Sequence, residues 1–95
     1  MSAYILVDCE VTDPARYEEY RALAPAAIAR YGGRYLARGG ETVRLEGDWV
    51  PRRVVVLEFP SLDAVKAFFD SPEYRAARAV RKDAAKMNMI AVAGV

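Results

Sequence analysis

The sequence contains no histidine and only one cysteine, Cys9. Histidine is the commonest metal ligand and the usual general base near neutral pH, so its absence excludes His-ligated metals and His-ligated haem. A single cysteine excludes an intramolecular disulfide framework and, without histidine, a structural zinc site built within one chain. We therefore expect no metal and no cofactor, and we expect Cys9 to be an inert buried thiol.

Excess charge and long apolar runs are also missing. Fourteen basic and thirteen acidic side chains leave a net charge of +1, which gives no electrostatic reason to expect nucleic acid or an anionic membrane as a partner. No apolar stretch reaches the ~18 residues that span a bilayer, and the first residues do not resemble a secretory signal. These absences predict a cytoplasmic protein with no nucleic-acid partner and no membrane partner.

What the sequence does contain is typical of one folded domain. Its 95 residues are 54% hydrophobic and 28% charged, which is ordinary for a folded chain and too apolar for a disordered one. We therefore expect residues 1–95 to form a single domain.

The first third of the chain predicts a strand followed by an amphipathic helix. Residues 4–10 form a short, mostly apolar segment, and its isoleucine and valine side chains favour a strand. Asp13 can cap a helix, Pro14 suits its first position and Gly32-Gly33 can end it. Pro25 lies inside this helix and should kink or break it. Apolar side chains at helical spacing predict its buried face: Tyr17, Tyr20, Ala24, Ala27, Ile28 and Tyr31.

The remainder predicts two more strands, a helix and a closing strand. Residues 34–38 form the second strand, and after a turn or bulge at Gly39-Gly40 it resumes at 42–46. Residues 53–59 are the clearest strand. A helix then begins at Ser61, restarts at Ser71-Pro72 and continues to about Lys86, before residues 87–95 close the chain as a strand.

This order of elements predicts an α+β, ferredoxin-like βαββαβ sandwich. Its four-stranded antiparallel sheet has two helices on one face, with the first and third strands side by side at the centre. Because strand side chains alternate between faces, Ile5, Val7 and Cys9 should face the helices. The opposite face is also largely apolar, through Tyr4, Leu6, Leu36, Val54 and Val56. A face this apolar predicts a homodimer that packs sheet against sheet.

Several segments also resemble the bacterial family known as domain of unknown function thirteen-thirty, in the dimeric α+β barrel superfamily. The segments that carry the resemblance are Thr12-Asp13-Pro14, Tyr17, Tyr20, 31–34, 45–49, 58–61, 71–74 and Arg81. The resemblance implies that two ferredoxin-like protomers close their sheets into one barrel, and it supplies no catalytic residues. Superfamily members include cofactor-free monooxygenases, muconolactone-type isomerases and haem enzymes, and the haem branch typically uses a histidine that this sequence lacks.

The candidate catalytic residues are three charged side chains, Asp8, Glu58 and Arg38. Strand alternation predicts that Asp8 and Glu58 point into the dimer barrel, and Arg38 plausibly faces the same space. Two neighbouring carboxylates would raise the pKa of one of them unless an arginine neutralises the pair. Among the other residues, Arg34 is either an anion ligand or a surface arginine, Trp49 covers a cleft or packs across the dimer, and a hydroxyl of Tyr20 or Tyr74 could reach a pocket.

Two functions remain open from the residues alone. In the first, the protein is a cofactor-independent enzyme for a small apolar or aromatic substrate, with Glu58 or Asp8 as acid or base and Arg38 stabilising negative charge. This function predicts a hollow of roughly 300 Å³ or more, lined by one of the carboxylates. In the second, the dimer is a non-catalytic ligand-binding or structural module, and the three charges fix its register. A loose divalent-cation site at Asp8 and Glu58 is a weaker third option.

Overall fold

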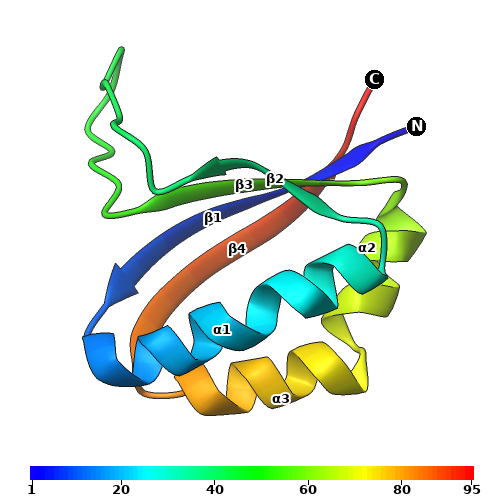
Figure 1. Cartoon of the computed structure of the whole chain (residues 1–95). Coiled ribbons are helices and arrows are strands. Elements are labelled where there is room, and N and C mark those ends of the chain that lie inside the picture. The colour runs from blue at the N-terminus through cyan, green and yellow to red at the C-terminus, as the bar shows by residue number, and fades with distance from the viewer.

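A computed structural model describes all 95 residues and shows a sheet covered on one face by helices (Figure 1). The elements along the chain are β1 (Ala3–Val11), α1 (Pro14–Arg30), β2 (Arg34–Arg38), β3 (Val54–Phe59), α2 (Leu62–Phe69), α3 (Pro72–Arg81) and β4 (Ala85–Ala93). The strand order is β2-β3-β1-β4, and every neighbouring pair is antiparallel. The predicted ferredoxin-like fold is confirmed, with β1 and β3 at the centre of the sheet. None of the helices has both the length and the apolar character needed to cross a membrane.

The helices begin where their capping residues predict. Asp13 accepts a hydrogen bond from the amide of Arg16 at 3.3 Å, and Pro14 occupies the first turn of α1. Ser61 accepts one from the amide of Ala64 at 3.0 Å and so caps α2. Each cap satisfies an amide that the first helical turn leaves without a partner.

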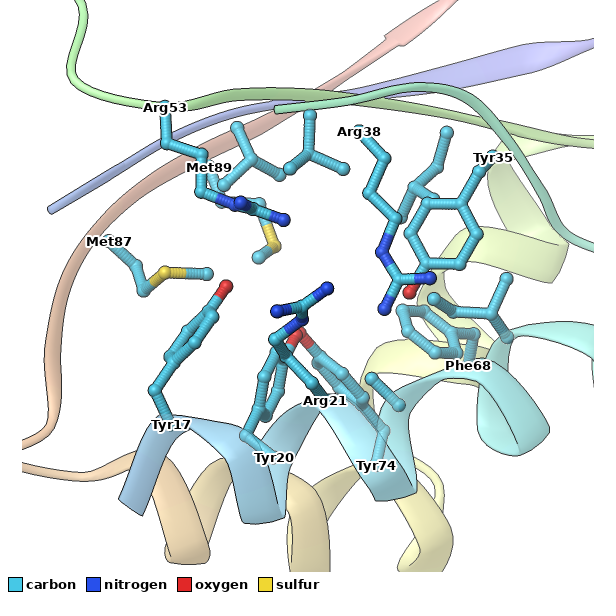
Figure 2. Close-up of a pocket in the computed structure, with 15 residues that line it drawn as sticks. Tyr17, Tyr20, Arg21, Tyr35, Arg38, Arg53, Phe68, Tyr74, Met87 and Met89 are labelled. Carbon is cyan, nitrogen blue, oxygen red and sulfur yellow. The ribbon is translucent and has the colours of Figure 1, made fainter. Parts of the chain in front are cut away.

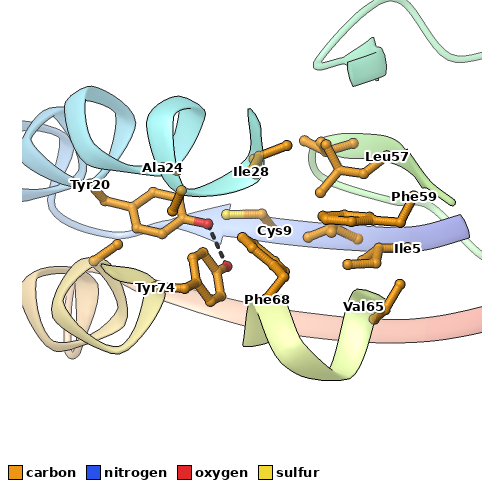
Figure 3. Packing of buried hydrophobic residues seen from close by; sticks show 14 of the residues in the cluster. Ile5, Cys9, Tyr20, Ala24, Ile28, Leu57, Phe59, Val65, Phe68 and Tyr74 are labelled. Carbon is orange, nitrogen blue, oxygen red and sulfur yellow. Dashed lines mark hydrogen bonds between the residues drawn. The ribbon is translucent and has the colours of Figure 1, made fainter. Parts of the chain in front are cut away.

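The core lies between the sheet and the helices and has the predicted faces (Figure 3). Ile5, Cys9 and Phe59 are almost completely buried beneath the helices. The rings of Phe59 and Phe68 have centroids 4.9 Å apart, and those of Phe68 and Tyr74 are 4.2 Å apart. This aromatic stack joins the sheet to α2 and α3, and Cys9 is the buried thiol that was expected.

The predicted break at Pro25 is wrong, because α1 continues through it to Arg30. Proline removes one amide donor and crowds the preceding turn, which costs about 3 kcal/mol in a helix interior. Residues on both sides of Pro25, including Tyr20, Ala24 and Ile28, are buried in the core. Tertiary packing of this face outweighs the local cost of the proline.

The second half contains two helices where one restarting helix was expected. Ser71 caps α3 through the amide of Tyr74, at 3.1 Å, and Pro72 begins it, so α2 and α3 are separate. The expected continuation to Lys86 is wrong, since α3 ends at Arg81 and Asp83 has a left-handed φ of 67°. This turn lets β4 begin at Ala85, two residues before the expected strand.

The predicted strand at 42–46 does not form. Residues 39–53 instead make a long irregular segment, which we call the arm and which projects beyond the sheet on the side away from the helices (Figure 1). Gly39, with φ of 71°, turns the chain out of β2 at the start of the arm. Without a partner strand for its hydrogen bonds, the 42–46 segment stays extended and exposed.

Candidate functional site

The structure separates the two carboxylates that the sequence brings to one face. Asp8 and Glu58 both point to the sheet face without helices, but Asp8 lies opposite Val54 whereas Glu58 lies opposite Tyr4. Their positions therefore differ by four residues along the strands, which is about 13 Å. Within one protomer they are therefore too far apart to form a pair of neighbouring carboxylates.

Asp8 is held by the arm. Its Oδ2 accepts a hydrogen bond from the indole Nε1 of Trp49 at 3.1 Å, and its Oδ1 accepts one from the amide of Arg52 at 3.0 Å. These hydrogen bonds, led by that from Trp49, lower the pKa of Asp8 below its usual value. Asp8 is thus ionised, and it anchors the arm to the sheet.

Glu58 is paired with Arg34 across β2 and β3. The Nε and Nη2 atoms of Arg34 both lie 2.7 Å from Oε1 of Glu58. The hydrogen bond from Arg34 lowers the pKa of Glu58, so an arginine neutralises this carboxylate, which is the exception to the raised pKa that was expected. Arg34 is therefore engaged by a carboxylate of its own chain.

Arg38 lies on the opposite side of the sheet from the two carboxylates. The pairing of β2 with β3 shifts between Tyr35 and Ala37, and this bulge places Arg38 opposite Val55. Because Val55 faces the helices, Arg38 does too, and it does not join Asp8 and Glu58. The prediction that the three charged side chains share one space is wrong for this physical reason.

Arg38 instead lines a cleft between α1 and the sheet (Figure 2). Twelve of the fifteen lining residues are hydrophobic, and no carboxylate is among them. We call it the arginine–tyrosine cleft, after the polar side chains that point into it: Arg21, Arg38, Arg53, Tyr17, Tyr20, Tyr35 and Tyr74.

The three arginines reach this cleft from different elements. Arg21 projects from α1, and its Nη1 lies 3.0 Å from Oε1 of Glu18. Arg38 stacks over the ring of Tyr35, 4.5 Å from its centroid. Arg53 directly precedes β3 in the chain. The Nε atoms of Arg53 and Arg21 are buried and have no hydrogen-bond partner. Two guanidinium donors at the cleft are therefore unsatisfied.

Gly39 makes room for one of these guanidiniums. A Cβ atom built on Gly39 would lie 2.6 Å from Nη1 of Arg53, closer than non-bonded atoms approach. Any larger residue would have to displace the Arg53 side chain. Gly39 therefore both turns the arm and admits Arg53 to the cleft.

The tyrosine hydroxyls form the polar floor. The hydroxyl oxygens of Tyr20 and Tyr74 are 2.7 Å apart, and the thiol of Cys9 donates to the hydroxyl of Tyr17 at 3.7 Å. Burial raises the pKa of Tyr17 to about 12 and also raises the pKa values of Tyr20 and Tyr35. At neutral pH these hydroxyls are protonated and can donate hydrogen bonds.

The cleft is narrow with the side chains in these positions. The empty space at the cleft, open solvent at its mouth included, is about 480 Å³, but the part that can hold the centre of a water molecule is about 30 Å³. One water needs ~10–15 Å³ by this measure, so the innermost space suits one or two waters or a group of similar size. No carboxylate lines this cleft, and guanidinium and phenol groups take that place. The carboxylate Asp8 instead lines a wider hollow of about 460 Å³ on the open face, together with Trp49 and Ile90.

Arg21 and Arg53 were not among the candidate residues from the sequence. A signal for Arg53 was present, since it alternates with Val55 and Leu57 and should share their face. Arg21 had no such signal, because it lies at the margin of the apolar stripe of α1. Nowhere in the chain do three cysteine or carboxylate side chains come together as possible metal ligands.

A family model described as domain of unknown function (DUF1330) matches residues 2–95. The chain belongs to the DUF1330 family. Among curated proteins, none matches it in sequence. The resemblance that the sequence motifs indicated is therefore confirmed at the level of the family.

Solved structures share the fold of this DUF1330 chain. The RPA0582 protein of unknown function from Rhodopseudomonas palustris has a TM-score of 0.78 at 21% identity, covering 99% of this chain and 82% of the other. A dimeric ferredoxin-like protein of unknown function from Thermobifida fusca has 0.68 at 20%, covering 99% and 92%. SnoaB, a cofactor-independent oxygenase from Streptomyces nogalater, has 0.66 at 16%, covering 99% and 93%. At these identities the likeness establishes the fold.

Proposed function

We propose that this DUF1330 protein is a homodimer that converts a small aromatic substrate without a bound cofactor, in the arginine–tyrosine cleft of each protomer. One observation carries the proposal: guanidinium and phenol groups converge on an otherwise apolar cleft (Figure 2). Apolar walls with a few convergent polar groups are the usual form of a small-molecule site.

Oxidation by dioxygen is the reaction class with most support. SnoaB, which shares the fold, is a cofactor-independent oxygenase, and this support is by analogy of fold. In such a reaction a phenol and O₂ give a quinone and water. One oxygen atom enters the ring, and the other leaves as water with two hydrogens from the substrate. The substrate is the reductant, so no cofactor is needed.

The polar groups of the cleft suit this chemistry without the carboxylates. The guanidiniums would balance the negative charge of an ionised substrate, and the protonated hydroxyl of Tyr17 would donate a hydrogen bond to a developing oxyanion. The predicted acid or base roles of Asp8 and Glu58 would require a second site on the open face. Asp8 and Glu58 each have partners there that lower their pKa values, so both are poor bases near neutral pH.

The open face of the sheet supports the homodimer. Leu6, Leu36 and Ile90 expose 40%, 48% and 63% of their surface on or beside it. The arm, which rises from the same side, exposes Val43, Leu45 and Trp49. A second copy packed face to face would bury the apolar side chains of the open face and those of the arm. A two-fold axis would make such a contact self-complementary.

Oxygen uptake tests the proposed reaction. Purified protein is incubated in air with a panel of phenols and hydroquinones, and O₂ consumption and quinone absorbance are followed together. We expect one substrate class to give O₂ uptake above the rate without protein and to lose it when Arg53 is replaced by methionine. The Arg75→Met variant, which removes an exposed arginine of α3 outside the cleft, is the matched control and should keep the activity. No uptake with any compound, despite ligand binding in the cleft, would reject the oxygenase reaction.

A non-catalytic ligand-binding or structural dimer is the alternative. The observation that favours it is the narrow cleft, which holds about 30 Å³ with the side chains as they are. Under this alternative Glu58→Gln alters dimer stability alone, and no compound of the panel is consumed.

A further inference from the structure

We infer that the arginine–tyrosine cleft selects an anionic ligand, an aromatic carboxylate whose carboxyl group is held by the guanidiniums of Arg38 and Arg53. This inference rests on the proposed function, since it names the ligand class of the same cleft. It begins with the charge balance. Three arginines line the cleft and no acidic residue does. Glu18 is the one carboxylate that pairs with any of them, and it contacts Arg21 from the exposed surface of α1.

Two buried guanidinium donors at the cleft have no hydrogen-bond acceptor. The Nε atoms of Arg21 and Arg53 are buried and lack a hydrogen-bond partner within the protein. Buried polar groups are nearly always paired, and a guanidinium can be paired only by an acceptor. An anionic acceptor in the cleft satisfies both the charge and the hydrogen-bonding capacity that the folded chain leaves open.

Two features of the backbone direct the arginines to this place. The bulge in β2 turns Arg38 from the open face to the cleft face, and the missing side chain at Gly39 leaves the space that the Arg53 guanidinium occupies. Figure 2 shows the two guanidiniums entering the cleft from the sheet side. Their convergence is thus built by the fold and is more than a surface accumulation of charge.

The size of the cleft favours a carboxylate over larger anions. About 30 Å³ of the cleft can hold the centres of water molecules, which is room for a group the size of one or two waters. A planar carboxylate has about this size, whereas a tetrahedral phosphate is larger. The planar fork of a guanidinium matches the two oxygens of a carboxylate. The aromatic ring of the ligand would then pack against aromatic side chains that line the cleft, among them Tyr35 and Phe68.

Calorimetry with benzoate and its neutral isostere benzamide tests the inference on the full chain. We expect benzoate to bind about tenfold or more tightly than benzamide at pH 7, since loss of a charge-assisted hydrogen bond has at least this effect. Arg53→Met and Arg38→Met should each remove this preference, because benzoate loses a charge-assisted hydrogen bond and benzamide loses only a neutral acceptor contact. Arg75→Met, on the exposed side of α3, should leave both affinities unchanged, and circular dichroism establishes that each variant is folded.

The other outcomes separate this inference from the proposed function. If benzoate and benzamide bind equally, anion selection is overturned, while a cleft that accepts aromatic compounds stands. If neither binds, the inference of an aromatic carboxylate is overturned, and the proposed function is then decided by the oxygen-uptake assay alone. If benzoate binds and both arginine variants retain the preference, the anion is held elsewhere. Inorganic phosphate and acetate are also compared as competitors of benzoate. If phosphate competes as strongly as acetate, the cleft binds anions in general, and the selection for carboxylates is overturned.

Discussion

The hydroxyl oxygens of Tyr20 and Tyr74 lie 2.7 Å apart and join α1 to α3 beneath the cleft (Figure 3). Both side chains are buried, with 8% and 1% of their surface exposed. The bond links residues 54 positions apart in the sequence. It therefore ties the two halves of the helical layer together at the point where the cleft has its floor.

Replacing Tyr74 by phenylalanine should lower the free energy of unfolding by about 1–3 kcal/mol, because the Tyr20 hydroxyl is left buried without its partner. The double variant Tyr20→Phe/Tyr74→Phe should lose less than twice this amount, since no orphaned hydroxyl remains. Urea denaturation measures both. Tyr31→Phe, which removes a partly buried hydrogen bond to Glu73, is the control and should cost less. Equal and additive losses for Tyr20 and Tyr74 would contradict the coupling.

Alkaline titration should show that buried tyrosines ionise late. The pKa of Tyr17 is raised to about 12, and those of Tyr20 and Tyr35 are raised as well. Their contribution to stability is complete below the ordinary pKa of 10.0 and is lost as pH rises through the folded-state values. Absorbance at 295 nm should therefore remain below that of six ionised tyrosines until the protein unfolds. Full ionisation of the folded protein near the ordinary pKa would contradict this.

The pair of Glu58 with Arg34 should make stability depend on pH in the acid range. The pKa of Glu58 in the folded protein lies below its ordinary value of 4.5, so the stabilisation is present above that pH and disappears as pH falls through the folded-state pKa. Glu58→Gln should be less stable than the parent at pH 7, with the difference shrinking below about pH 4.5. Thermal unfolding across pH measures this. Glu46→Gln, in the exposed arm, is the control and should keep the stability of the parent at pH 7.

A lysine on the open face should prevent dimerisation. Ile90 exposes 63% of its surface there, and burying a lysine without a partner in a sheet-to-sheet contact is strongly unfavourable. Light scattering should give twice the chain mass of 10.5 kDa for the parent and the single-chain mass for Ile90→Lys. Leu23→Lys changes a residue of similar exposure, 45%, on α1 and should leave the mass unchanged. A dimeric Ile90→Lys variant would place the interface elsewhere.

Alanine at Gly39 should disturb both the arm and Arg53. The left-handed φ of 71° disfavours alanine by about 1 kcal/mol, and the added Cβ would collide with Nη1 of Arg53. We expect lower stability and weaker benzoate binding. Gly40→Ala is the matched control, because Gly40 has no atom within 4 Å of an added Cβ and has no left-handed φ. Similar effects for both variants would remove the role assigned to Gly39.

Local signals predicted most of the fold. Asp13, Ser61 and Ser71 begin helices in the structure because short polar side chains satisfy the first amides whatever lies farther away. Alternation along β1 placed Ile5 and Cys9 correctly, since a regular strand keeps its two faces. These features depend on residues within one turn or one strand.

The candidate site was harder to predict because it depends on irregular backbone and long-range packing. Alternation fails at the bulge in β2, and so the sequence assigned Arg38 to the wrong face. The 42–46 segment has strand character but no strand beside it, and pairing is decided by tertiary structure. Asp8 and Glu58 share a face as predicted, yet the antiparallel register separates them, and register cannot be read from one strand alone.

The bulge also makes β2 a point of thermodynamic linkage between the two faces of the sheet. This five-residue strand sends Arg34 to Glu58 on the open face and Arg38 to the cleft. A ligand that fixes Arg38 and a second copy that covers Arg34 would both favour the same strand register. Each would then strengthen the other by an equal factor, because coupling between two binding events is reciprocal. The dimer's dissociation constant would in that case fall, with both clefts occupied, by the square of the factor through which dimerisation raises the affinity of each cleft.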